Sequence, residues 1–163
     1  MQYSPDLGLW FSASSTLSLS GYSDVDFAGC HLDRKYTSGT CQFLGSSLVS
    51  WSSRKQSSVA QSTTEAEYVA AASCCSQLLW IAYTLSDFGE ECSHVPLLCD
   101  STSAISVVKN LVLSGKTKHI EVRYHFLRDN VEKGKISLSY VPTRDQLADI
   151  FTKSLDQATF ARL

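Results

Sequence analysis

The stretch from Ser62 to Gly89, STTEAEYVAAASCCSQLLWIAYTLSDFG, decides the fold of this chain. Ser62 followed three residues later by Glu65 is the pattern of a capping box, which marks the start of a helix. Gly89 is a residue type that commonly ends one. We therefore predict a single long helix over residues 63–88, around which the rest of the chain must pack.

Helical phase separates the two carboxylates near the start of this helix. Glu65 lies about 200° around the helix from Glu67, because each residue advances about 100°. We predict that Glu67 points inward and that Glu65 interacts with the helix N-terminus. Glu67 shares its face with an apolar stripe that should pack on a sheet: Ala70, Ala71, Cys74, Leu78, Ile81 and Leu85.

Three strand patterns precede the helix. Residues 17–27, 39–45 and 48–52 are rich in alternating, aromatic or β-branched positions, which favours strands. The short Ser46–Ser47 gap suits a hairpin, and the short links together predict an antiparallel meander. The polar residues 54–58 then form a loop leading to the helix.

After the helix the pattern changes to alternating helices and strands. Residues 95–99 predict a strand that pairs in parallel, and residues 136–141 predict the last strand, which Pro142 ends. Helices are expected over residues 101–108, 120–133 and 144–153. The order β-β-β-α-β-α-α-β-α predicts an α/β fold, with a mixed sheet, right-handed crossovers and helices on both faces.

The composition is that of a folded domain with little charge. Of 163 residues, 44% are hydrophobic and 18% charged, which suits one core and argues against disorder. The net charge of -2 argues against a strongly basic, stand-alone nucleic-acid-binding protein. The six cysteines form no zinc-like grouping, so we expect free, buried thiols. We find no secretory signal and no uninterrupted apolar run of membrane-spanning length, and expect no membrane partner.

Four acidic motifs separated in sequence carry the candidate chemistry. Asp24 and Asp26 share one face of their strand, so the residues alone do not choose between them. Asp100 ends the strand of residues 95–99, at the edge where α/β sheets form sites. Asp149 lies on the last expected helix. A single acidic residue at any one of these positions would usually be only a helix cap or turn residue. Several carboxylates that converge beside apolar residues instead favour a divalent metal site.

Seven blocks of the sequence, in order, closely resemble the ribonuclease H domain of copia-type LTR retrotransposon polyproteins, particularly plant ones. The resemblance runs from Pro5 almost to the C-terminus. The matching blocks are residues 22–29 (YSDVDFAG), 33–39 (DRKYTSG), 50–56 (SWSSRKQ), 64–68 (TEAEY), 99–100 (CD), 117–120 (TKHI) and 145–153 (DQLADIFTK).

The resemblance implies the ribonuclease H-like fold, with a five-stranded mixed sheet: three antiparallel strands, two parallel additions and flanking helices. Motif by motif, it implies that Asp24, Glu67, Asp100 and Asp149 are the catalytic and metal-binding residues. The implied reaction is endonucleolytic hydrolysis of the RNA strand of an RNA–DNA hybrid during reverse transcription. Two Mg²⁺ ions about 4 Å apart, replaceable by Mn²⁺, would hold the scissile phosphate.

The family also implies the surroundings of this domain. Residues 17–155 would form the ribonuclease H-like domain, residues 1–16 an extension from the reverse transcriptase, and residues 156–163 a tail. The partners would be the hybrid and the reverse transcriptase domain of the parent polyprotein. Localisation would be cytoplasmic, in virus-like particles, or nuclear. Apart from the resemblance, we predict from their charge that two basic tracts contact hybrid phosphates, although a charged loop is more often only solvated: Arg54, Lys55, Lys116, Lys118, His119 and Arg123.

Several alternatives stay open. Cellular ribonucleases H carry a histidine in a loop before the last carboxylate, but residues 141–145 hold none. His119 or His125 would have to replace it, or both are structural. The main functional alternative is a catalytically weak or inactive nucleic-acid-binding remnant of a transposon. Another nuclease on the same fold, such as an integrase or junction resolvase, is a further hypothesis.

Overall fold

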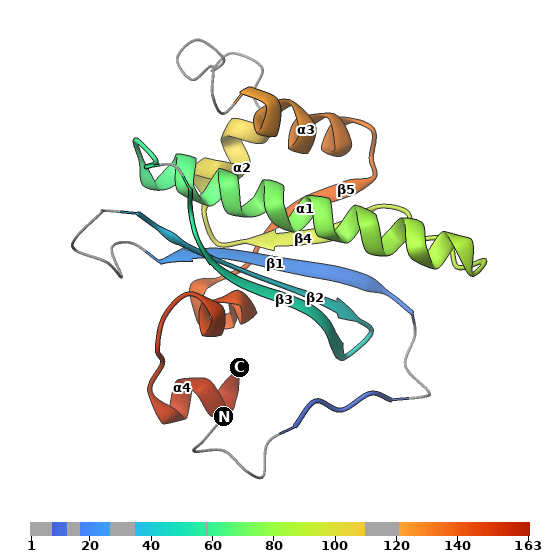
Figure 1. Ribbon diagram of the computed structural model, residues 1–163, viewed down its shortest axis with the longest axis horizontal. Helices are drawn as coiled ribbons and strands as arrows, with labels where there is room; N and C mark the ends of the chain where they lie inside the picture. Colours follow the sequence, from blue (N-terminus) through green and yellow to red (C-terminus); the bar gives the residue numbers. More distant parts are fainter. Residues whose placement is uncertain (1–7, 13–16, 27–34, 58, 110–120) are drawn as a thin grey trace.

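A five-stranded mixed sheet organises the chain, with strand order β3-β2-β1-β4-β5. The computed structural model describes residues 8–12, 17–26, 35–57, 59–109 and 121–163 (Figure 1). β1, β2 and β3 are antiparallel, whereas β4 pairs in parallel with β1 and with β5. The strands are β1 (Leu19–Asp26), β2 (Thr37–Leu44), β3 (Ser47–Lys55), β4 (Val95–Cys99) and β5 (Ile136–Tyr140).

The β2–β3 hairpin differs from its sequence prediction at both ends. Gly45 and Ser46 form the turn, one residue earlier than expected, because Gly45 adopts a positive φ of 61° that glycine tolerates. β3 continues through Arg54 and Lys55, which pair with Ser38 and Thr37 of β2. The prediction of a loop beginning at residue 54 is therefore wrong: pairing with the start of β2 extends the strand.

Helix α1 (Thr63–Asp87) lies across one face of the sheet, as predicted. Ser62 caps it by accepting a hydrogen bond from the backbone N–H of Glu65. The helix sits close to β1 because Gly21 has no side chain: a Cβ there would lie 2.9 Å from Leu78 Cδ1. By length and hydropathy α1 could cross a membrane, but a buried core helix passes the same test, and the buried face of α1 forms the main core with β1, β4 and β5.

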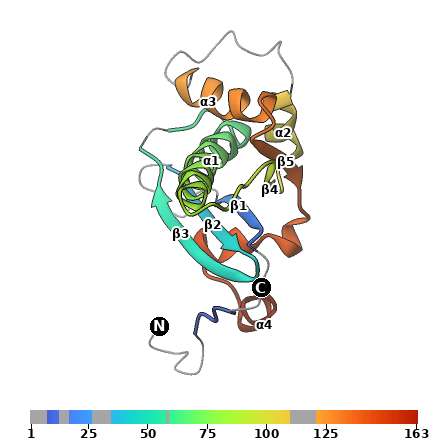
Figure 2. The same ribbon diagram turned by 90° about the vertical axis from the view of Figure 1, so that its right-hand side faces the viewer.

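The other helices divide between the two faces of the sheet. α2 (Thr102–Lys109) and α3 (Glu121–Glu132) lie on the α1 side, and α4 (Gln157–Arg162) lies on the opposite side (Figures 1 and 2). The predicted helix over residues 144–153 is wrong. Two 3₁₀ turns replace it, η1 (Thr143–Asp145) and η2 (Leu147–Phe151). Between them Gln146 is extended, with ψ 100°, which interrupts any continuous helix.

The described cysteines are free, as expected. Cys41, Cys74, Cys75 and Cys99 are buried, and Cys92 is half-buried. Burial raises the pKa of the Cys74, Cys75 and Cys99 thiols to about 12. These thiols are therefore protonated at neutral pH and pack as small apolar side chains.

Candidate functional site

Strand register brings acidic residues together at one edge of the sheet. Ser23 of β1 pairs with Cys99 of β4, so the residues that follow them, Asp24 and Asp100, lie at the same end of two neighbouring parallel strands. Glu67 reaches this edge from the first turns of α1, and Asp149 reaches it from η2. The charges of Asp24, Asp100 and Asp149 all raise the pKa of Glu67. The four carboxylates therefore form one electrostatic cluster.

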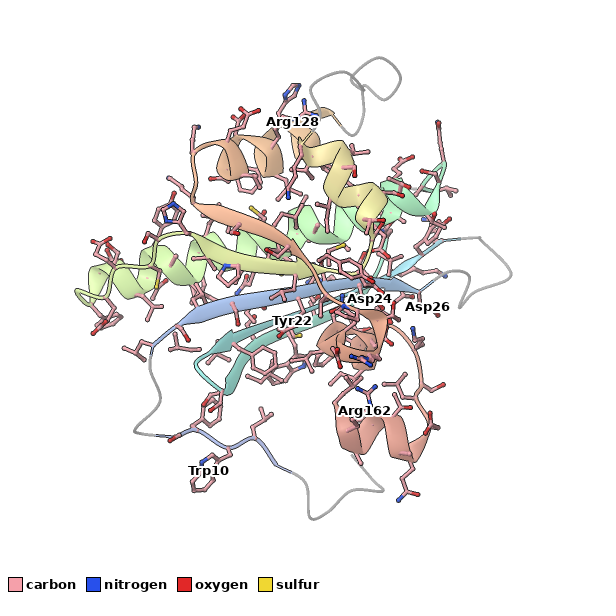
Figure 3. All side chains as sticks on the ribbon, turned by 180° about the vertical axis from the view of Figure 1, so that it is seen from behind. Trp10, Tyr22, Asp24, Asp26, Arg128 and Arg162 are labelled. Carbon is pink, nitrogen blue, oxygen red and sulfur yellow. The ribbon has the colours of Figure 1, made fainter. Side chains whose placement is uncertain are left out.

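Asp24 is the most enclosed member of the cluster, with 4% of its surface exposed. Its Oδ2 accepts a hydrogen bond of 2.7 Å from Thr152 Oγ1. Burial, together with the adjacent Asp149 carboxyl, raises the pKa of Asp24 to about 7. Asp26 lies at the same end of β1 but is half-exposed (Figure 3). The structure thus places Asp24 inside the cluster and Asp26 at its margin.

The segment after β5 is attached to β1 through side chains. Gln146 is fully buried, and its Nε2 donates to the carbonyl of Ser23, beside Asp24. Asp149 is buried and pairs with Lys153, with 2.8 Å between Oδ1 and Nζ. Burial lowers the pKa of Lys153, but the hydrogen bond to Asp149 and the charges of Asp149, Asp24 and Asp26 together outweigh this, and the net shift is upward. One fixed cation therefore offsets part of the cluster's negative charge.

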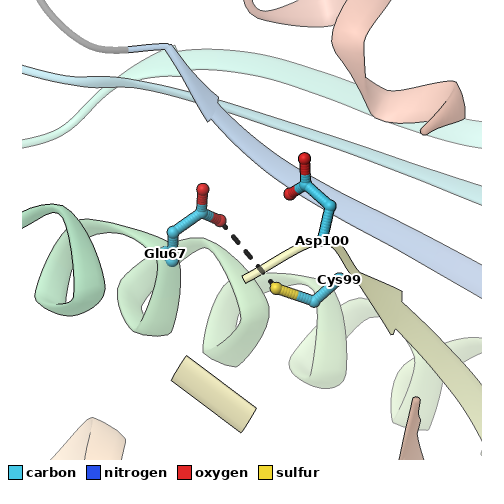
Figure 4. Close-up of side chains that lie close together, drawn as sticks. All are labelled: Glu67, Cys99 and Asp100. Atoms are coloured by element: carbon cyan, nitrogen blue, oxygen red, sulfur yellow. Dashed lines mark hydrogen bonds between the residues drawn. The ribbon is translucent and has the colours of Figure 1, made fainter. Parts of the chain in front are cut away.

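A thiol accompanies the other two carboxylates. Cys99 Sγ donates to Glu67 Oε2 at 3.9 Å, and ligand atoms of Glu67, Cys99 and Asp100 lie within 4.8 Å of one another (Figure 4). Burial, followed by the neighbouring charges, raises the pKa of Glu67 to about 9. Asp100 Oδ2 accepts a hydrogen bond of 2.7 Å from Thr143 Oγ1. Sequence reasoning missed Cys99 in this cluster, because a cysteine in an apolar strand indicates only core packing.

Glu65 and Glu67 divide their roles as helical phase predicted. Glu65 serves the helix N-terminus: its Oε2 accepts from the backbone N–H of Gln61 at 2.8 Å. It is nevertheless the more buried of the two, at 5% exposure, whereas Glu67 is half-buried. Burial alone would have selected Glu65 as the cluster member, but the direction of the side chain selects Glu67.

Gly39 allows η2 to approach the sheet beside Asp24, its partner in the β1–β2 register. A Cβ at Gly39 would lie 2.6 Å from Thr152 Cγ2 and 2.7 Å from the carbonyl oxygen of Ala148. We expect Gly39→Ala to lower the free energy of unfolding by about 1–3 kcal/mol, because backbone must move to admit the methyl group. Chemical denaturation measures this, with Gly8→Ala as control, since a Cβ at Gly8 meets nothing within 4 Å. Equal stability of the two variants would contradict close packing of η2 on Gly39.

The predicted phosphate-binding residues are only partly described. Arg54 and Lys55 are exposed at the end of β3, on the edge of the sheet that also carries Asp24. Lys116, Lys118 and His119 lie outside the described residues, and the side chain of Arg123 is likewise not described. The structure therefore gives positions for Arg54 and Lys55 alone among these candidates.

Two residues of α3, Arg128 and the candidate histidine His125, lie away from the cluster. Arg128 donates to the carbonyls of Val107 and Val108, which joins α3 to α2. His125, also on α3, is exposed. Nothing described here brings either of them to the carboxylates.

The donor set of the cluster suits a hard divalent cation. Carboxylate oxygens are the ligands that Mg²⁺ prefers, and four of these groups converge. Burial, and then the neighbouring carboxylates, raise the pKa of Asp24 and of Glu67, so ionising both groups is unfavourable without a cation beside them. Bound cations would compensate these charges.

Relatives of the chain are transposon polyproteins. No protein-family model matches it. It is 42% identical, over 96% of its length, to a retrovirus-related Pol polyprotein from transposon RE2 of Arabidopsis thaliana. It is 36% identical, over 93% of its length, to one from transposon TNT 1-94 of Nicotiana tabacum. The chain spans only 11% of each of these relatives.

Solved structures with the same fold are ribonuclease H domains. LC11-RNase H1, isolated from compost, aligns with a TM-score of 0.61 at 16% identity, over 84% of this chain and 94% of that protein. Its complex with an RNA/DNA hybrid aligns at 0.56 and 15% identity, over 83% and 94%. Prototype foamy virus protease-reverse transcriptase aligns at 0.55 and 13% identity, over 83% of this chain and 20% of that one. These similarities confirm the predicted ribonuclease H-like fold.

Proposed function

Since the chain belongs to the retrovirus-related Pol polyproteins of plant transposons and has the ribonuclease H-like fold, we propose that it cleaves the RNA strand of RNA–DNA hybrids. The observation that carries this proposal is the convergence of Asp24, Glu67, Asp100 and Asp149 from four separate elements. A hybrid-bound structure of LC11-RNase H1, which has the same fold, supports the substrate.

In this proposal the four carboxylates hold two divalent metal ions, Mg²⁺ or Mn²⁺. When bound, these ions would activate the attacking water and neutralise charge on the scissile phosphate. Asp24, the most buried of the four carboxylates, would help to hold these ions. Asp149 would serve the side of the attacking water, whereas Glu67 and Asp100 would serve the side of the leaving 3′ oxygen.

Neighbouring side chains orient these ligands. The Thr152 hydroxyl fixes one oxygen of Asp24, and the Thr143 hydroxyl fixes one oxygen of Asp100. Lys153 donates to Oδ1 of Asp149 and fixes that oxygen beside Asp24. Such partners of metal ligands commonly contribute about 10–100-fold to metal affinity or activity.

The proposed enzyme would work as one domain of a polyprotein. Residues 17–155 would form the catalytic unit, residues 1–16 would connect it to a reverse transcriptase, and residues 156–163 would form a tail. The foamy virus protease-reverse transcriptase, which contains a segment of the same fold, supports that arrangement. The sites of action we propose are cytoplasmic particles or the nucleus.

Incubation with a labelled RNA–DNA hybrid tests the function. We expect cleavage of the RNA strand with Mg²⁺ or Mn²⁺, products with 5′-phosphate and 3′-hydroxyl ends, and none with EDTA. Asp100→Asn is the control, since it removes one proposed ligand with little change of shape. Cleavage no greater than that of Asp100→Asn at high enzyme concentration would refute catalysis and favour an inactive remnant. Preferential cutting of duplex DNA would instead indicate another nuclease of this fold.

The salt dependence of hybrid binding tests Arg54 and Lys55. Each phosphate contact releases condensed counterions, so replacing either residue with serine should flatten the slope of log K against log salt by about one unit. Fluorescence anisotropy across a salt series measures that slope. Lys133→Ser is a suitable control, because Lys133 pairs with Asp129 on the exposed surface of α3. A slope unchanged in the Arg54 and Lys55 variants would exclude them from the phosphate contacts.

A further inference from the structure

A polar groove of about 500 Å³ separates α1 from the two outer strands β2 and β3. Figure 2, which looks nearly along α1, shows β3 curving beside this helix. Gly39, where η2 packs on β2, lies between Ser38 and Thr40 and so faces the other side of the sheet. None of the four carboxylates lines the groove. The groove is therefore distinct from the carboxylate cluster.

Register arranges the groove walls in three rows. Ser38, Thr40 and Gln42 alternate along β2 and face α1, as the strand period of two requires. Their β3 partners are Arg54, Ser52 and Ser50, respectively. The helix contributes Val69, Ser73 and Gln77, spaced one turn apart.

Hydrogen-bonding side chains dominate these walls. Five serines line the groove, and none of its described lining residues is acidic. Gln42 and Gln56 are buried in the wall, and the Oε1 atom of each has no hydrogen-bond partner within the described part of the chain. The polar groups of the groove are thus incompletely satisfied by the protein itself, which favours a polar ligand.

The amino-acid composition of the groove lining favours a nucleic acid over a protein as its ligand. Serine and lysine are depleted at protein–protein interfaces, so this lining is unlike a protein-docking surface. Sugar and phosphate groups of nucleic acids are bound by Arg, Lys, Ser, Thr and Gln side chains among others, and these five types make up all of the lining except Trp51 and Val69. The volume suits a short segment of one strand, in the range of ordinary ligand pockets.

The cationic end of the groove faces the edge of the sheet that carries the carboxylates. Asp24 pairs with Gly39, and Gly39 pairs with Ser53, next to Arg54. Two strand spacings, about 10 Å, separate β1 from β3. A strand leaving the carboxylate cluster could therefore enter the groove past Arg54 without crossing the helix.

From this geometry we infer that the α1–β3 groove binds a single nucleic-acid strand through its sugar–phosphate backbone, next to the cleavage site. The inference deepens the proposed function by giving a path for the strand beyond the scissile phosphate. It predicts sequence-independent binding, because backbone contacts carry no base information.

Paired substitutions on β3 test the groove. Ser52 faces the groove, whereas the adjacent Ser53 is exposed on the other face of the strand. Because both residues are serine, Ser52→Glu and Ser53→Glu give proteins of the same composition and charge. We expect Ser52→Glu to weaken binding of a single-stranded RNA 12-mer about tenfold, through like-charge repulsion, and Ser53→Glu to leave it nearly unchanged. Anisotropy with the full chain in EDTA at low salt measures both without cleavage.

A second variant guards against misfolding. Gln77→Glu keeps the side-chain shape on α1 and places the charge on the opposite wall, so it should also weaken binding. Equal affinity of Ser52→Glu, Gln77→Glu and Ser53→Glu would overturn the inference. Competition by AMP as strong as by the 12-mer would also overturn it, since that result indicates a mononucleotide site. Because EDTA abolishes the proposed catalysis, failure to cleave hybrids would leave this binding test unaffected.

Discussion

Asp24→Asn should reduce cleavage of an RNA–DNA hybrid by about 10³-fold or more, or about 4 kcal/mol in the activation barrier. The substitution removes the most buried carboxylate of the cluster, which we propose helps to hold the metal ions. The amide can still accept from Thr152, so the fold should survive. Single-turnover cleavage at saturating Mg²⁺ measures the loss.

Asp26→Asn is the matched control for this substitution. Asp26 has the same side chain, lies two residues along the same strand and is half-exposed at the margin of the cluster. We expect a change of only a few-fold. Similar losses of activity in the two variants would mean that Asp24 contributes no more to cleavage than Asp26 does. Retained activity in Asp24→Asn would contradict the proposed set of metal ligands.

The second large effect concerns pH and stability without metal. Folding raises the pKa of Asp24 from 3.8 to about 7 and that of Glu67 from 4.5 to about 9. Between pH 4 and 9 the folded state therefore binds protons that the unfolded state has lost. Stability falls with pH wherever the folded state binds more protons. In EDTA, the melting temperature should decrease by several degrees from pH 5 to pH 9.

Divalent metal should reverse that decrease. Mg²⁺ or Mn²⁺ binds the ionised carboxylates of the folded state, so it should raise the melting temperature more at pH 8 than at pH 5. Glu67→Gln should flatten the pH profile in EDTA, because it removes the group with the higher raised pKa. Thermal melts of both proteins, with and without millimolar metal, measure these effects. A flat profile for the unsubstituted protein would contradict the assembled cluster.

Local signals predicted α1 well, whereas contacts distant in sequence decided the C-terminal segment. The cap at Ser62 and the glycine at position 89 bounded α1 to within one residue. Residues 144–153 have helical spacing, but the Gln146 side chain bonds to Ser23 and to Ala148, which fixes an extended residue between two 3₁₀ turns. The helix cap at Asp156, which accepts from Thr159, was a readable signal for α4 that the sequence prediction left in a tail.

In the candidate site too, local patterns predicted some of the residues, whereas contacts distant in sequence decided the others. Helical phase placed Glu67 on the inward face, and the end of the strand over residues 95–99 placed Asp100 at an edge of the sheet. The residues alone did not choose between Asp24 and Asp26, and only the family resemblance indicated Asp24. The contact of Cys99 with Glu67 depends on the approach of α1 to β4, which no pattern in the chain encodes. The α1–β3 groove likewise arises from the registers of β2 and β3 combined, and could not be predicted from either strand alone.

Counting bound Mn²⁺ by electron paramagnetic resonance, in a complex with a non-cleavable RNA–DNA hybrid, tests the metal-binding cluster most directly. We expect about two ions per complex for the unsubstituted protein and for Asp26→Asn, with loss of binding in Asp24→Asn. No hybrid-dependent Mn²⁺ binding, or the same binding in Asp24→Asn as in the unsubstituted protein, would contradict a metal centre built on Asp24, Glu67, Asp100 and Asp149.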